Sequence, residues 1–125
     1  MTTVVIEPDD RLLRRIFWGN FDEKKKTVNS SAFRREPELS VYLERLQSAD
    51  EALAVGRPGQ GVAMFLARVA LDLGLTVVHD PVLPNEYGHC LINGIAGKAM
   101  ARALAVACTV IVEPQPAPPN QVLDD

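Results

Sequence analysis

The chain has 125 residues, of which 47% are hydrophobic and 23% charged, a composition typical of a globular protein of single-domain size. No apolar run reaches the ~20 residues that a membrane-spanning helix needs, and the start, MTTVVIEPDDR, lacks the basic and apolar regions of a signal peptide. With Cys90 and Cys108 as the only cysteines, no disulfide framework is expected. These features predict a cytoplasmic protein with reduced thiols and no membrane contact.

The net charge of −3 is unevenly distributed. Residues 11–35 hold eight Lys and Arg against two acidic residues, a local balance of +6. Because the whole chain carries −3, the remainder carries −9. Such a segment is typical either of a basic face that meets an anionic partner or of an ordinary solvated surface.

The first half of the chain gives short, mixed signals. Residues 11–18 fit either a helix or a strand, since their apolar positions match helical spacing over only two turns. Residues 31–34 and 39–43 are strand-like around Pro37, which predicts a hairpin. Ser48 or Asp50 then caps a short helix over 51–55.

The second half begins with an apolar stretch that has two interpretations. Residues 61–73 form either one helix or a strand over 62–65 followed by a short helix over 67–73; length and Ala/Leu content favour the single helix. Strands are predicted at 75–79, 90–92 and 109–112, and an alanine-rich helix at 97–107 with Met100, Leu104 and Ala107 along one face.

These elements predict an α+β fold. Residues 1–113 are expected to form one compact domain with a mixed or mostly antiparallel sheet and two main helices on one face. Residues 114–125 are proline-rich and acidic, which predicts a disordered tail.

His79 and His89 are the candidate catalytic residues. If their strands pair around the 80–88 loop, both imidazoles lie near the loop mouth, where they could act as general base and general acid on a phosphodiester. Histidines bonded to the loop backbone are the structural alternative. Their spacing matches no zinc pattern, so no metal and no cofactor are expected.

The basic third supplies candidate residues for binding an anion or a nucleic acid, because arginine binds phosphate bidentately and hydroxyls add donors. These candidates are Arg14, Arg15, Arg34, Arg35 and Ser31. Four aromatic residues could stack bases or belong to the core: Trp18, Phe21, Phe33 and Tyr42. Gly56, Gly59 and Gly61 flank a second loop that could face an anion, although their spacing is no phosphate-loop motif.

The chain resembles a family of small bacterial proteins of uncharacterised function. The similar segments are SSAFR at 30–34, ELSV at 38–41, GVA at 61–63, VVHDP at 77–81 and His89 with its apolar strand. The resemblance spans about residues 10–114 and implies a bacterial source and one compact domain. It implies no activity, so no residue role follows from it.

Two functions follow from these observations. The first is a non-enzymatic binding or accessory module of a bacterial operon, with a protein partner, a second copy or an anionic partner such as nucleic acid. The alternative is a small RNA- or nucleotide-directed enzyme that uses His79 and His89 beside the basic face. The first is favoured because no catalytic set is complete in the sequence.

Overall fold

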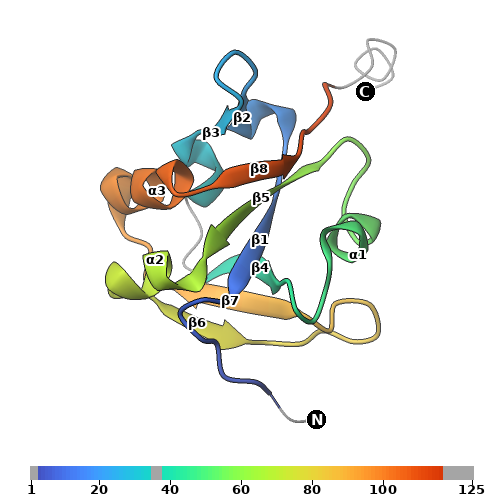
Figure 1. Ribbon diagram of the computed structural model, residues 1–125, viewed down its shortest axis with the longest axis vertical. Helices are drawn as coiled ribbons and strands as arrows, with labels where there is room; N and C mark the ends of the chain where they lie inside the picture. The colour runs from blue at the N-terminus through green and yellow to red at the C-terminus, as the bar shows by residue number, and fades with distance from the viewer. Residues whose placement is uncertain (1–2, 35–37, 117–125) are drawn as a thin grey trace.

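The chain forms a six-stranded antiparallel sheet with short helices on both sides, an α+β fold in one compact domain (Figure 1). The computed structural model describes residues 3–34 and 38–116. The strands lie in the order β6-β7-β4-β1-β5-β8, and every neighbouring pair is antiparallel. Their bounds are β1 (Arg11–Ile16), β4 (Glu38–Leu43), β5 (Gly61–Leu66), β6 (Thr76–His79), β7 (His89–Asn93) and β8 (Thr109–Val112).

Alternating side chains give the sheet two apolar faces. The α3 face carries residues such as Leu12, Val41 and Phe65, which pack against α2 (Ala67–Asp72) and α3 (Gly97–Val106). The opposite α1 face carries a smaller cluster, Leu13, Tyr42 and Val62, under α1 (Ala49–Ala54). Figure 1 shows α2 and α3 on one side of the sheet and α1 on the other. The expectation of two helices on one face is therefore confirmed, with a third, short helix behind the sheet.

The predicted helices at 97–107 and 51–55 are present with small changes. In α3, Leu104 is fully buried and Met100 packs at the edge of the core, whereas Ala107 is exposed rather than part of the buried face. In α1, the cap is Ser48: its hydroxyl accepts from the Glu51 amide, and the Glu51 carboxylate accepts from the Ser48 amide.

The single helix favoured for residues 61–73 is wrong, and the alternative of a strand and a short helix is right. Residues 61–66 form β5, which pairs with β1 along six positions and with β8 on its other side. Val62 and Phe65 bury their side chains on opposite faces of the sheet, which only an extended chain allows. Pairing on both sides outweighs the modest helix preference of Ala and Leu.

The strand predicted at 39–43 is confirmed as β4, but the strand predicted at 31–34 and the hairpin between the two are wrong. Residues Ser30–Phe33 form a 3₁₀ turn, η2, in which the Asn29 side chain accepts from the Ser31 amide. Phe33 is buried against Phe65, so its burial comes from the core and not from pairing with β4. Residues 35–37, the expected turn, lie outside the described part of the chain.

The ambiguous residues 11–18 form a strand that ends in a second 3₁₀ turn, η1 (Trp18–Asn20). A two-stranded ribbon follows, β2 (Phe21–Asp22) and β3 (Thr27–Val28), with the lysines of the charge run at its tip. Within residues 3–34 and 38–116, no helix is long and apolar enough to cross a membrane.

The packed chain continues beyond the boundary expected at residue 113. Pro114 is buried, and the Gln115 amide donates to the carbonyl of Gly59. A Cβ at Gly61 would lie 2.5 Å from the Pro114 nitrogen, so this crossing requires glycine. Residues 117–125, most of the predicted tail, are outside the described residues.

Candidate anion-binding site

The site lies where β1 and β4 separate. These two strands pair only through Leu12 with Leu43 and Leu13 with Tyr42. Beyond these two pairs, β1 stays paired with β5 and β4 stays paired with β7, so β1 and β4 diverge and a fork opens between them. Arg14 spans the fork: its Nε donates to the Ala32 carbonyl at 3.1 Å and its Nη1 to the Ser40 carbonyl at 2.9 Å.

An open cavity of about 490 Å³ lies over this fork. The residues lining it are mostly polar and come from β1, η1, η2, β4 and the loop before β5: Arg14, Arg15, Phe17, Asn20, Ser31, Ala32, Arg34, Ser40, Arg57 and Gln60. Four of the ten are arginines and none is acidic. The cavity is therefore positively charged, which favours an anionic ligand.

Three of the four described arginines outside the cavity are paired with a carboxylate, and the fourth, Arg102, is not. Arg11, Arg45 and Arg68 each form an ion pair with a carboxylate, of Glu44, Asp10 and Asp9 respectively. No residue within 3–34 or 38–116 forms an ion pair with Arg15, Arg34 or Arg57. No carboxylate among the described residues therefore neutralises these three guanidinium groups at ion-pair distance.

The structure brings together four of the five candidate residues for binding an anion: Arg14, Arg15, Arg34 and Ser31 line this one cavity. Arg35, the fifth, lies outside the described residues. The hydroxyl of Ser31 is held by both Asn20, which donates to it at 3.0 Å, and Asn29.

The sequence interpretation missed Arg57 and Gln60. Both lie in the glycine-containing loop between α1 and β5, which was a separate candidate. Gly56 lets this loop approach β1: a Cβ there would lie 2.6 Å from Arg15 Nη1 and closer still to Gln60 Oε1. The glycines in this loop were the available signal, although the expected helix start behind them is a strand.

The aromatic candidates for stacking are mainly core residues. Phe21, Phe33 and Tyr42 are buried, and Arg15 lies over the Tyr42 ring with its Cζ 5.2 Å from the centroid. Phe17, which the sequence did not single out for this role, is 49% exposed and lines the cavity.

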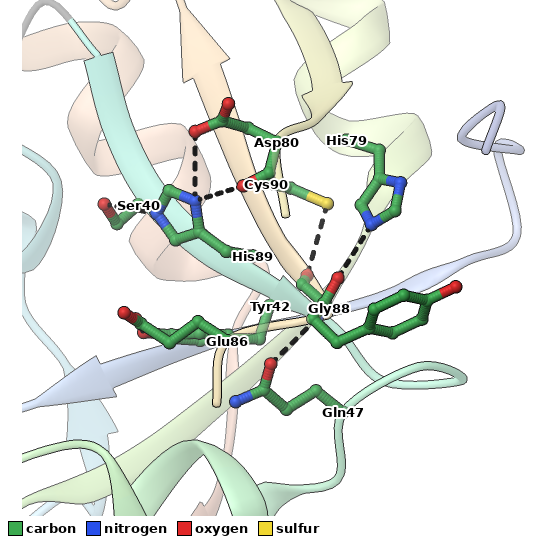
Figure 2. Close-up of polar contacts among 10 residues, drawn as sticks. Ser40, Tyr42, Gln47, His79, Asp80, Glu86, Gly88, His89 and Cys90 are labelled. Carbon is green, nitrogen blue, oxygen red and sulfur yellow. Dashed lines mark hydrogen bonds and ion pairs between the residues drawn. The ribbon is translucent and has the colours of Figure 1, made fainter. Parts of the chain in front are cut away.

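His79 has a structural role. It is buried at the end of β6 on the α3 face, where its Nδ1 accepts from the Val4 amide at 3.0 Å. Its Nε2 lies 2.8 Å from the Tyr87 carbonyl, to which it donates (Figure 2). Both ring nitrogens are therefore used to fasten the N-terminal segment and the hairpin loop to the sheet.

His89 has different surroundings. It lies opposite Tyr42 on the α1 face, with its Nδ1 2.9 Å from the carbonyl of Asp80 and 3.3 Å from that residue's carboxylate. Its Nε2 lies 3.0 Å from Ser40 Oγ, as Figure 2 shows. Burial, and a hydrogen bond to Glu86, raise the pKa of Tyr42 to about 12, so this neighbour is a neutral phenol at physiological pH.

The two histidines are at the same end of the β6–β7 hairpin but on opposite faces of the sheet. His79 pairs with Cys90, whose side chain belongs to the α3 face, and His89 is the next residue along β7. Neighbouring residues of a strand point to opposite sides. The two imidazoles therefore cannot act as base and acid on one substrate, which corrects the idea of a shared site.

No group of three or more potential metal ligands occurs among the residues that the structure describes. Cys90 and Cys108 are free thiols, and burial raises the pKa of each to about 12, so neither is a ready nucleophile.

Comparisons with protein-family models, curated proteins and solved structures give no match. A function for this site is therefore argued from the residues that form it. These are an arginine-lined cavity and, at its wall, a serine that is hydrogen-bonded to a histidine.

Proposed function

We propose that the protein is a binding module for a phosphate-bearing partner, which it holds in the arginine cavity. The convergence of Arg14, Arg15, Arg34 and Arg57 on a cavity whose described lining residues include no acidic side chain is the observation that supports this. Guanidinium groups match the oxygens of phosphate in pairs, and the side-chain amide of Gln60 adds a further donor.

A nucleotide or the end of an RNA strand is the phosphate-bearing partner that suits this cavity best. Phe17 offers an exposed ring at its wall, and a base can stack on such a ring regardless of its sequence. The guanidinium groups would hold the phosphate while the ring holds the base. A simple inorganic anion would contact the guanidinium groups but leave the Phe17 ring unused.

The test is an equilibrium titration with adenosine monophosphate, with adenosine as the ligand control. In the double variant Arg34→Ala/Arg57→Ala we expect affinity for the nucleotide to fall roughly tenfold or more, since a hydrogen bond to a charged group contributes about 1.5–3 kcal/mol. The matched control is Arg11→Ala/Arg68→Ala, which removes the same charge from exposed ion pairs outside the cavity. Equal losses in both double variants would reduce the effect to net charge and refute a specific site.

A protein partner, or a second copy of the chain, is a second candidate. Edge strand β6 and the loop after it expose the apolar side chains of Val78, Val82 and Leu83, and an edge strand offers unpaired backbone groups to another chain. Sedimentation at increasing concentration tests it, with Val78→Lys expected to remove any self-association. The free thiols of Cys90 and Cys108 are compatible with a cytoplasmic setting for either function.

A further inference from the structure

The hydrogen bonds of His89 define its tautomer. The Asp80 carbonyl, 2.9 Å from Nδ1, can only accept a hydrogen bond, so Nδ1 carries the proton. The neutral ring then has its lone pair on Nε2, which lies 3.0 Å from Ser40 Oγ. The serine hydroxyl therefore donates to the imidazole, which is the arrangement of a nucleophile and its general base.

A third group stands behind the histidine. The Asp80 carboxylate lies 3.3 Å from Nδ1 and is half exposed. When His89 takes up a proton it becomes a cation, and this carboxylate is close enough to stabilise the charge. The three groups therefore form a chain of contacts, from the Ser40 hydroxyl to the His89 ring to the Asp80 carboxylate, as Figure 2 shows. Ser40 lies in β4, His89 in β7, and Asp80 directly after β6.

His79 provides an internal comparison. Its two nitrogens are both bonded to backbone groups, and no side-chain hydroxyl is among its hydrogen-bond partners in the described chain. Ser40, in contrast, is only partly buried and lines the arginine cavity, while its own carbonyl is held by Arg14. The hydroxyl that His89 can activate is therefore on a residue at the wall where the ligand's phosphate would bind.

We infer that Ser40 is the nucleophile of a phosphoester hydrolase, with His89 as its base and Asp80 as the group that stabilises the resulting imidazolium. This inference rests on the proposed binding function and adds a chemical step to it. Arginines around a transferring phosphoryl group stabilise the negative charge on its oxygens. The four arginines of this cavity would act in this way.

The reaction has two steps. Ser40 Oγ attacks phosphorus and forms an O–P bond while the bond from phosphorus to the leaving oxygen breaks. The hydroxyl proton passes to His89 Nε2 and from there to the leaving oxygen, which departs as an alcohol. A water molecule then attacks the phosphoserine with His89 taking its proton. The O–P bond to Ser40 breaks, the proton returns to Oγ, and inorganic phosphate leaves.

The experiment follows hydrolysis of p-nitrophenyl phosphate by the full chain together with adenosine monophosphate binding. We expect the wild-type protein to release p-nitrophenol, and Ser40→Ala to lower the rate roughly 10²–10⁴-fold while nucleotide affinity is retained. Ser30→Ala, which removes a hydroxyl in η2 from a residue that does not line the cavity, is the matched control and should leave the rate unchanged. Asp80→Asn should lower kcat with KM unchanged, because its carboxylate touches the base and not the substrate.

The outcomes separate this inference from the binding proposal. Nucleotide binding by the wild-type protein without any release of p-nitrophenol, or with equal release from Ser40→Ala, would overturn the nucleophile and leave the binding site standing. Absence of nucleotide binding would contradict the binding site itself. If Ser40→Ala does not fold, acid quenching of the wild-type reaction and mass spectrometry decide: a phosphoryl group on Ser40 is expected, and its absence during steady turnover overturns the mechanism.

Discussion

Arg14 Nη1 and the carbonyl oxygen of Ser40 are joined by a 2.9 Å hydrogen bond that bridges β1 and β4 beyond the end of their ladder. The same guanidinium donates through Nε to Ala32 in η2. One side chain thus satisfies two carbonyls at the fork while it adds positive charge to the cavity wall. Arg14 therefore both bridges the separated strands and is one of the four arginines that line the cavity.

Replacing Arg14 with Ala should therefore destabilise the protein, apart from any effect on binding. Two half-buried carbonyls would lose their donor, and leaving a buried polar group unsatisfied costs about 1–3 kcal/mol. Chemical denaturation measures the loss. Arg34→Ala is the control: it removes the same charge from an exposed side chain of the same cavity and should change the free energy of unfolding by less than ~0.5 kcal/mol. Equal stability of both variants would contradict the bridging role.

Gly56→Ala tests the shape of the cavity at constant charge. The new Cβ would meet Gln60 Oε1 and Arg15 Nη1, and because both are ends of flexible side chains, these would shift instead of the backbone. We expect weaker nucleotide binding with nearly unchanged stability. Gly19→Ala is the control, since a Cβ there meets nothing within 4 Å. Unchanged affinity in Gly56→Ala would show that the position of Arg15 is unimportant for the ligand.

The second half of the fold was predictable where local signals agreed with tertiary pairing. The β-branched segment at 76–79, the apolar segment at 89–93 and the alanine-rich helix α3 occur where the sequence predicts them. Residues 61–66 were misinterpreted because their apolar side chains are buried on both faces, which removes the alternation that distinguishes a strand. The choice between helix and strand for these residues depends on their pairing with β1 on one side and β8 on the other, which the sequence does not reveal.

The site was predictable in part, for a similar reason. Arg14, Arg15 and Arg34 stand out as a charged segment, but their convergence with Arg57 depends on a fork between two strands.

The positions of the two histidines were also predictable only in part. The alternation of a strand already places the side chain of each histidine on the opposite face of the sheet from its neighbour in the chain. The pairing of His79 with Cys90, which puts the two imidazoles on opposite faces of the sheet, is set by the register of two strands and cannot be read from either strand alone. The contact of His89 with Ser40, 49 residues away in the chain, gave no local signal.

Tyr42 should make stability depend on alkaline pH. Burial, with the hydrogen bond to Glu86, raises the pKa from 10.0 to about 12, so the folded state favours the neutral phenol more than the unfolded chain does. Its contribution is complete below pH 10 and is lost as the pH rises towards 12. Ultraviolet titration should show one tyrosinate appearing late, and Tyr42→Phe should remove it. A late component that persists in this variant would contradict the assignment.

His79→Phe should separate the structural histidine from the one beside the cavity. The substitution keeps an aromatic ring but removes the acceptor for the Val4 amide and the donor to Tyr87, so residues 3–7 should exchange amide hydrogen faster. Nucleotide binding and any hydrolysis should persist, because His79 lies on the opposite face of the sheet from His89 and is not among the residues that line the cavity. His89→Phe is the counterpart, which should abolish hydrolysis while residues 3–7 stay protected. Loss of hydrolysis in a folded His79→Phe protein would return His79 to the catalytic machinery and undo the division of roles.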